Sequence, residues 1–468
     1  MLVFVLTANG QTAISLKSVR SVYVGSLGAD QGAEELKREL IHDLSRSGHF
    51  TVVPQIRQAD ALIDGKGELW VKGYHSLSPR ARINPSYAEP VHDGYLSVKV
   101  HGKDDQILWS YFADPRRISF RELKRDLVDE VVSELTQDRD LETTPPAPPS
   151  NANDVPASLR GAGATFPFPL YQDWFNTFKR QHPAWSFDYA GIGSDLGITQ
   201  LAAGSIDFAG SDIPPGELGN RIPPGSNSFP TVGGAVVLIY NLPGVTSELR
   251  LTPDLIAGIF SGSIRTWNDP ALTAMNPSVP LPAAPIATFH RSDGSGTTYA
   301  FTDYLSKVDE RWRAQNGAAA GIAWASGTGA NGNEDLAKSV AGTPYSIGYV
   351  EFIYAFENHL SFAAVRNLAG RFVHADLLSI MAAANGAGEK DQYLSLSITN
   401  SLAANAYPIS TFSWLVAPNS RDAAKETAFK TFIEWMLTSG QRQCSALGYA
   451  PLPKNLVDRE LSAVRKLK

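Results

Sequence analysis

The sequence contains a single cysteine, Cys444, so no disulfide can form within the chain. That absence neither indicates nor excludes export, because a chain with a large core does not need disulfides for stability. No stretch approaches the roughly 20 consecutive apolar residues of a membrane-spanning helix. Positive charge is not in excess either, since 41 Lys and Arg stand against 47 Asp and Glu for a formal net charge of −6. We therefore expect neither a membrane-spanning protein nor a basic surface for nucleic acid.

The usual signatures of an enzyme are also missing. The histidines are scattered and have no metal-ligand spacing, and we interpret them as ordinary solvated or packed residues. Ser194 and Ser295 have no evident base nearby, so we predict no catalytic residue, no metal and no cofactor. The histidines in question are His42, His49, His75, His92 and His101 in the first part of the chain, and His182, His290, His359 and His374 in the rest.

The N-terminus reads MLVFVLTANGQTA, in which LVFVL is apolar and ANGQTA could end an export signal. A basic segment before it is absent and the apolar run is short, which is atypical of a signal peptide. Two interpretations stay open, the start of an export signal and the first strand of a domain.

With 468 residues, 43% hydrophobic and 19% charged, the chain should form a globular protein of two or three domains. The clearest boundary is the stretch TTPPAPPSNANDVPAS, whose prolines disfavour both helix and sheet. We predict a small domain at 1–142, a proline-rich linker at 143–157 and a larger domain at 158–468.

The first domain alternates strand-like segments such as SVYVGSL and GYLSVKVHG with two amphipathic helical patterns. One pattern places Leu36, Leu40 and Leu44 on a common face, and the other does so with Leu123 and Leu127. This is a small α+β domain, and its opening resembles the small domains of bacterial envelope assembly proteins (TolB N-terminal or CsgG-like).

The larger domain has an α/β pattern and contains three glycine-rich loops, each followed by a helical pattern. They are GAGATFPFP, where Thr165 is a candidate N-cap, YAGIGSDLG, which contains Ser194, and HRSDGSGTT. A helix N-terminus carries partial positive charge and unpaired N–H donors, so it can bind an anion. One such loop would be explained by capping alone, but three in one domain favour a shared oxyanion ligand.

Charged residues near these loops refine the prediction. Arg291 would supply positive charge through its planar fork of donors, and Asp293 could orient that fork. Asp212 follows a short strand, and a carboxylate suits an anion site when the anion itself carries a proton. Phosphate does so near neutrality and sulfate does not, so Asp212 would discriminate between them. Taken alone, Asp212 could equally be a turn residue and Arg291–Asp293 a surface ion pair.

The motifs GAGATFPFPLY, GIGSDLG, DFAGSD, HRSDGSGTT, SIGYVEFIYA and GYAPLP occur in this order from about residue 158 to the end. In this order and spacing they resemble the substrate-binding protein of the bacterial ABC phosphate importer, the PstS family. The resemblance implies a type II periplasmic-binding-protein fold, a Venus flytrap of two α/β lobes. Lobe one would comprise 158–233 and 406–468, and lobe two 234–405.

The resemblance also implies a ligand and partners. Inorganic phosphate would bind between the lobes and pass to the membrane subunits of an ABC importer, in a periplasmic or cell-envelope setting. The family pattern assigns the phosphate site to Thr165, the backbone N–H of Phe166, Ser194, Asp212, Arg291, Ser295, Gly296 and Thr297, with Asp293 as the partner of the arginine.

Two features depart from the family. Asp195 follows the binding serine where a small residue is usual, and we expect it to face solvent in the first turn of its helix. The additional domain at 1–142 could tether, dimerise or couple the binder to another envelope component. Two alternatives to transport stay open, a phosphate-responsive envelope scaffold or sensor and, less favoured, a phosphatase.

Overall fold

The structure is a computed structural model that describes residues 15–76, 88–102, 106–113, 120–141, 155–385, 397–419 and 422–465. The apolar N-terminal stretch and all but the last three residues of the proline-rich segment lie outside these ranges. Within them, no helix is both long enough and apolar enough to cross a membrane.

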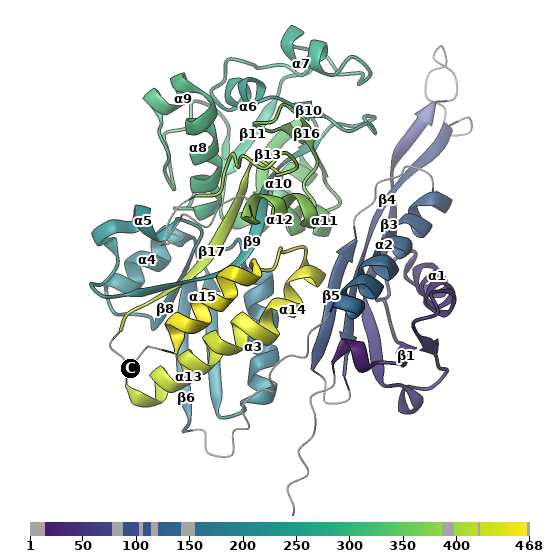
Figure 1. The fold of residues 1–468 in the computed structure, drawn as a ribbon. Helices are drawn as coiled ribbons and strands as arrows, with labels where there is room; N and C mark the ends of the chain where they lie inside the picture. Colours follow the sequence, from purple (N-terminus) through teal and green to yellow (C-terminus); the bar gives the residue numbers. More distant parts are fainter. Residues whose placement is uncertain are drawn as a thin grey trace, which may run out of the picture.

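The N-terminal part forms a five-stranded sheet covered by two helices (Figure 1). The strand order is β2-β1-β3-β4-β5, parallel among the first three and antiparallel from β3 to β5. The leucines that the helical pattern places on one face are buried, as the amphipathic pattern predicts. The elements are β1 (Ser21–Val24), α1 (Ala33–Arg46), β2 (Thr51–Val52), β3 (Ala61–Ser76), β4 (Ala88–His101), β5 (Ile107–Ala113) and α2 (Phe120–Leu141).

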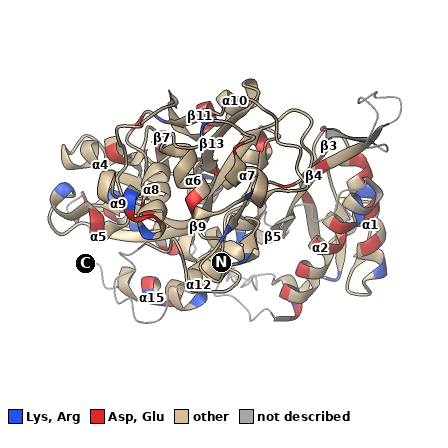
Figure 2. Cartoon of the chain, turned by 90° about the horizontal axis from the view of Figure 1, so that it is seen from above, with Lys and Arg blue, Asp and Glu red and all other residues tan. Residues whose placement is uncertain are grey.

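The two helices of this part carry many charged residues. In the view from above, both basic and acidic residues lie along α1 and α2 (Figure 2). Their leucines face the sheet, so the charged residues cover the opposite, solvated faces.

The rest of the chain is built on one sheet with the order β12-β11-β13-β9-β17-β8-β6-β7, with β14 also pairing with β9. The strands at each end are parallel, whereas β9 and β17 run antiparallel to their neighbours. The strands are β6 (Ala157–Gly163), β7 (Trp185–Gly191), β8 (Phe208–Ser211), β9 (Asn227–Asn241), β11 (Ala287–Arg291), β12 (Thr328–Ala330), β13 (Ser346–Glu351), β14 (Ser361–Phe362) and β17 (Ser410–Ala417).

The long buried strand β9 divides this sheet into two lobes. Its first part pairs with β17, and its last part, from Val236 to Asn241, pairs with β13. We call the half with β6, β7, β8 and β17 lobe one and the half with β11, β12 and β13 lobe two. A small sheet of β10 (Arg250–Leu251), β15 (Ala364–Arg366) and β16 (Phe372–Val373) adds to lobe two.

Helices cover the sheet in both lobes (Figure 1). Lobe one has α3 (Phe168–Gln181), α4 (Ser194–Ala202), α5 (Pro215–Leu218), α13 (Ala423–Trp435), α14 (Gln441–Cys444) and α15 (Lys454–Val464). Lobe two has α6 (Pro253–Phe260), α7 (Pro270–Met275), α8 (Gly296–Val308), α9 (Glu310–Gln315), α10 (Gly332–Gly342), α11 (Phe352–Glu357) and α12 (Leu377–Asn385).

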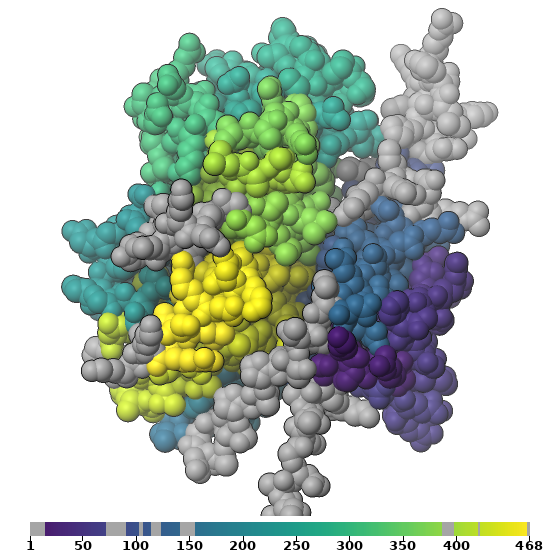
Figure 3. All heavy atoms as spheres, viewed as in Figure 1, coloured from purple at the N-terminus to yellow at the C-terminus, as the bar shows by residue number. Residues whose placement is uncertain are grey.

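The N-terminal sheet packs directly against the two-lobed part, as the space-filling view shows (Figure 3). Phe112 on β5 contacts Phe352 and Phe356 of α11, with ring centroids 6.0 and 5.0 Å apart. One hydrophobic core therefore runs from the N-terminal sheet into both lobes. Burial of this shared apolar area stabilises the attachment in the same way as it stabilises each lobe.

Candidate anion-binding site

The predicted site residues follow the carboxyl ends of parallel strands in the two lobes. Thr165 comes after β6, Ser194 after β7 and Asp212 after β8, while Arg291 is the last residue of β11. Ligand sites of α/β sheets form where such strand ends meet, because the loops after them converge. The sheet therefore brings together residues that are separated by more than a hundred positions in the sequence.

Tyrosine hydroxyls hold the loop after β6 through its carbonyl oxygens. The carbonyl oxygen of Thr165 accepts a hydrogen bond from the Tyr354 hydroxyl at 2.8 Å, and that of Phe166 accepts one from Tyr449 at 2.6 Å. We expected Thr165 to be the N-cap of the following helix, and this prediction was wrong. Pro167 holds that position, because α3 starts only at Phe168.

Ser194 is fully buried at the first position of α4. The preceding Gly193 has φ +91°, a left-handed conformation that glycine adopts without strain. The next residue, Asp195, is half-exposed, and its carboxylate pairs with Arg221 at the surface. Asp195 thus lies in the first turn of α4 and is partly exposed to solvent, as expected.

Asp212 is 1% exposed and has one satisfied and one unsatisfied carboxylate oxygen. The Ser413 hydroxyl donates to Oδ1 at 2.6 Å, whereas no group of the described residues makes a well-formed hydrogen bond to Oδ2. Burial raises the pKa of Asp212 to about 7, although the Ser413 hydrogen bond, the charge of Arg291 and the nearby Ser194 hydroxyl act in the opposite direction. Part of this carboxyl is therefore ionised at neutral pH and can accept a hydrogen bond from a protonated anion.

In lobe two, Arg291 forms a two-pronged pair with Asp293. Its Nε donates to Asp293 Oδ1 at 2.7 Å, and its Nη2 donates to Oδ2. Burial alone would raise the pKa of Asp293, but the hydrogen bonds and charge of Arg291 outweigh it and hold that pKa below its usual value. Asp293 fixes the plane of the guanidinium, and Nη1 is directed toward the Thr297 hydroxyl at 3.3 Å.

The N-terminus of α8 completes the lobe-two side of the site. We call the site residues of each lobe its wall. Ser295 is the N-cap of α8, which starts directly after the predicted loop, and its hydroxyl accepts a hydrogen bond from Thr298 N at 3.1 Å. Gly296 and Thr297 are the first two helical residues, so their N–H groups have no partner within the helix. All three residues are buried.

The two walls face each other at close range. A Cβ built on Gly296 would lie 2.6 Å from Asp212 Oδ2, so a side chain at this position would collide with lobe one. Asp195 N donates to Gly294 O at 3.0 Å, which is a direct hydrogen bond between lobes. The lobes are therefore closed on each other around these residues.

Sequence reasoning missed two further residues of the site. The amide of the buried Asn333 donates to Thr165 Oγ1 at 3.1 Å and to Thr297 Oγ1 at 3.2 Å. Its sequence context, ANGNEDLAK, has the same glycine-before-helix pattern as the three predicted loops and could have drawn attention to it. Ser413, the partner of Asp212, is one of several hydroxyl residues in the buried strand β17.

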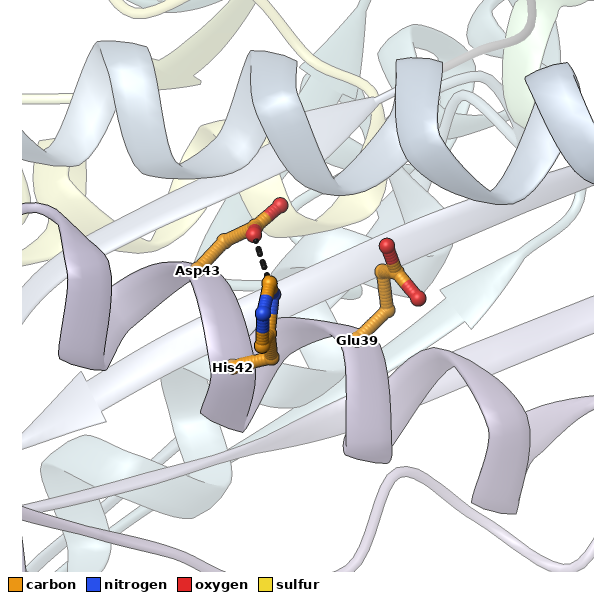
Figure 4. Close-up of side chains that lie close together, drawn as sticks. All are labelled: Glu39, His42 and Asp43. Atoms are coloured by element: carbon orange, nitrogen blue, oxygen red, sulfur yellow. Dashed lines mark hydrogen bonds and ion pairs between the residues drawn. The ribbon is translucent and has the colours of Figure 1, made fainter.

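The histidines occupy other places. His182 is stacked between Phe178 and Trp185, and His290 is stacked on Trp324. Among the described residues, the one grouping of histidine and carboxylates with metal-ligand spacing is Glu39, His42 and Asp43 on α1 (Figure 4). It lies on the N-terminal sheet's helix layer, and His42 Nδ1 is bonded to Asp43 Oδ1 at 2.8 Å.

Two α/β lobes that share a sheet and enclose a buried polar site between them define a bilobal ligand-binding protein. The family model described as a PBP superfamily domain matches residues 146–439. The phosphate-binding protein PstS of Xylella fastidiosa is 39% identical over 315 residues, which cover 66% of this chain and 85% of that protein. PstS of Haemophilus influenzae is 38% identical over 304 residues, which cover 64% and 90%. The chain thus belongs to the PBP superfamily and, within it, to the PstS family.

Solved structures agree on the fold. A high affinity periplasmic phosphate-binding protein, PfluDING bound with phosphate, superposes with a TM-score of 0.52 at 20% identity, covering 65% of this chain and 93% of that one. The phosphate-binding protein of Stenotrophomonas maltophilia gives 0.51 at 17% identity, with the same two coverages. The predicted two-lobed periplasmic-binding-protein fold is confirmed.

Proposed function

We propose that this chain binds inorganic phosphate between its two lobes and delivers it to an ABC-type phosphate import system. Support comes from the PstS relatives, whose names state that they bind phosphate, and from the closed site described above. The membrane subunits of the importer are the proposed partners. The periplasmic origin of one structural neighbour supports an exported location.

The observation that carries the proposal is the unpartnered oxygen of Asp212, facing a buried arginine across the lobes. A buried acceptor without a donor is costly, so the ligand that relieves it should bring a proton. Arg291 requires that the same ligand be negatively charged. Hydrogen phosphate meets both requirements, whereas sulfate at neutral pH meets the second alone.

The proposed ligand set uses both lobes. Lobe one contributes neutral donors and the acceptor Asp212, and lobe two contributes the charge and the helix N-terminus. Asp293 acts through Arg291, because its oxygens are engaged by the guanidinium and by Gly332 N. The remaining proposed contacts are Thr165, Phe166 N–H, Ser194, Ser295, Gly296 and Thr297.

A phosphatase is the weaker alternative. Hydrolysis needs an activated nucleophile or a metal cluster. Among the described residues no histidine is hydrogen-bonded to Ser194 or Ser295: Ser194 Oγ accepts from Asp212 N, and Ser295 Oγ accepts from Thr298 N. A phosphate-responsive scaffold differs from a transporter in what binding triggers, and the N-terminal sheet would then contact another envelope component.

Calorimetric titration of the ligand-free protein with phosphate and then with sulfate at neutral pH tests the proposal. We expect tight phosphate binding and no response to sulfate. Equal binding of both anions would contradict the role of Asp212, and absence of phosphate binding would contradict the function itself. Release of inorganic phosphate from a phosphomonoester by the same preparation would favour the phosphatase.

A further inference from the structure

Asn333 links the hydroxyls of the two walls. It is 0% exposed near the start of α10, and its side-chain amide reaches one threonine from each lobe. The donor distances are 3.1 Å to Thr165 Oγ1 and 3.2 Å to Thr297 Oγ1. One amide NH2 group has two protons, so each threonine receives one of them.

The orientation of this amide is determined by the backbone. Glu351 N, at the end of β13, donates to Asn333 Oδ1 at 3.1 Å. An N–H group can only donate, so the end of the amide that faces it must be the oxygen and the NH2 must face the threonines. The NH2 in turn can only donate, so both threonine oxygens act as acceptors toward it.

This arrangement determines where the hydroxyl protons point. The oxygen of Thr297 already accepts from Asn333 and from Arg291 Nη1, so both of its lone pairs are engaged. Its single proton must then be directed to another acceptor. Thr165 Oγ1 accepts one hydrogen bond, from Asn333, which turns its proton away from the amide. The acceptor that the proposed phosphate site supplies is the anion itself.

We propose that Asn333 is a positioning residue that turns the hydroxyl protons of Thr165 and Thr297 toward the bound anion. The inference rests on the proposed phosphate site and explains why the two threonine hydroxyls would donate to the anion. Asn333 can make both hydrogen bonds only when the lobes are closed, because its two acceptors belong to different lobes.

Phosphate titrations of four proteins test this: wild type, N333A, T165V/T297V and the triple variant. N333A should weaken binding by about 10- to 100-fold in the wild-type background, because two donors to a charged ligand lose their orientation. In the T165V/T297V background the same change should cost less than about threefold, since no hydroxyl is left to orient.

A matched control is N367A. Asn367 is also buried and donates to two acceptors, Ala404 O and Ala406 O, while its own oxygen accepts from Arg371 N. N367A should lower the melting temperature to a similar extent and leave phosphate affinity within about twofold. Equal costs of N333A in both backgrounds would overturn the inference and leave phosphate binding intact. A wild-type protein that binds no phosphate would overturn the proposed function and this inference together.

A second inference comes from a separate surface, where the N-terminal sheet contacts both lobes at once. On lobe one, the Ser97 hydroxyl donates to Ala446 O at 2.7 Å, and Lys99 pairs with Asp173 at 2.9 Å. On lobe two, Glu68 pairs with His359 at 2.9 Å.

The lobe-two attachment is also aromatic. Trp70 stacks on His359 with ring centroids 4.4 Å apart, and Tyr95 and Phe112 pack on Phe356. When the lobes separate, the attachment points on lobe one move relative to those on lobe two. The N-terminal sheet cannot follow both movements as a rigid body, so opening should break some of these contacts.

We infer that the N-terminal domain is a brace that stabilises the closed arrangement of the two lobes. Amide hydrogen exchange of the full chain tests this without any ligand, because Asp195 N bonds to Gly294 O across the lobes and is exposed to solvent when they part. H359N should accelerate exchange of this amide by about three- to tenfold. Asparagine suits the left-handed backbone of His359, whose φ is +53°.

The matched control is H374N. His374 also lies in lobe two, pairs with Glu248 at 2.7 Å and stacks on Phe362 at 4.4 Å, but these partners lie within lobe two. Its replacement should leave exchange of the Asp195 amide within about twofold of wild type. Equal exchange in H359N and H374N would overturn the brace.

Discussion

The two walls of the site differ in chemistry although both are built from strand ends. The lobe-one wall offers hydroxyls and a carboxyl whose second oxygen has no donor among the described residues. The lobe-two wall offers a buried arginine held by Asp293 and the first N–H groups of α8. One wall thus presents an acceptor that lacks a donor, and the other presents a guanidinium and backbone N–H donors.

This difference shows how a site can select an anion by more than its charge. A wall of donors alone would accept any small oxyanion of suitable size. In the proposed site, the facing carboxylate would disfavour anions without a proton, because two negative oxygens would then be in contact. Substitutions that affect one wall at a time separate the two contributions.

The largest effect should come from the lobe-two wall. R291A should weaken phosphate binding by about 3–5 kcal/mol, because a buried anion loses its compensating charge. R291K should be intermediate, since lysine keeps the charge and loses the fork of donors. Calorimetry measures both variants. A loss within the roughly 1 kcal/mol of an exposed ion pair would contradict a role of the arginine in the site.

Stability of the ligand-free protein should respond to the lobe-one wall through pH. The pKa of Asp212 is raised to about 7 in the folded chain from 3.8, so its contribution to stability is present below pH 4 and is lost as pH rises through 7. D212N should therefore become more stable relative to wild type between pH 4 and pH 8, by up to about 4 kcal/mol.

Denaturant unfolding of both proteins at several pH values tests this expectation. D195N is the control for removing an aspartate outside the buried site, because Asp195 is half-exposed. A difference between D212N and wild type that does not change with pH would mean that Asp212 has the same pKa in the folded and unfolded chains.

Selectivity should change with the same substitution. D212N should reduce discrimination between phosphate and sulfate by at least about tenfold, because the carboxamide can donate to sulfate through its NH2 group. Competition titrations of the two anions at neutral pH measure the ratio. Unchanged selectivity would refute the role of Asp212 as the proton acceptor.

The smallest effect is expected just outside the lobe-one wall. D195N removes a carboxylate next to Ser194, but this carboxylate is paired with Arg221 at the surface. Phosphate affinity should change by less than about threefold, as is usual for exposed pairs. A change above about tenfold, measured by the same titration, would mean that the Asp195 carboxylate acts electrostatically on the bound anion.

Local patterns in the sequence predicted much of the fold and part of the site. The leucine spacing in α1 and the start of a helix after HRSDGSGTT depend on neighbouring residues, so they can be inferred from short segments. The loop at Thr165 was misread because its helix begins three residues later, at Phe168. Capping preferences describe the first helical turn and do not fix where it starts.

Partners distant in the sequence could not be predicted. Ser413 lies 201 residues from Asp212, and Asn333 lies 168 residues from Thr165. Their proximity is produced by the strand order, in which β17 lies next to β8, and by closure of the lobes. Hydrophobic periodicity identifies strands but does not specify which strand lies beside which.

The aromatic contact between β5 and α11 has a practical consequence. Cutting the chain within the proline-rich segment would expose Phe352 and Phe356, which are buried beside Phe112 in the full chain. An apolar patch of this kind promotes self-association. The shortened protein would accordingly be less soluble than the full chain, even with every residue of the anion site in place.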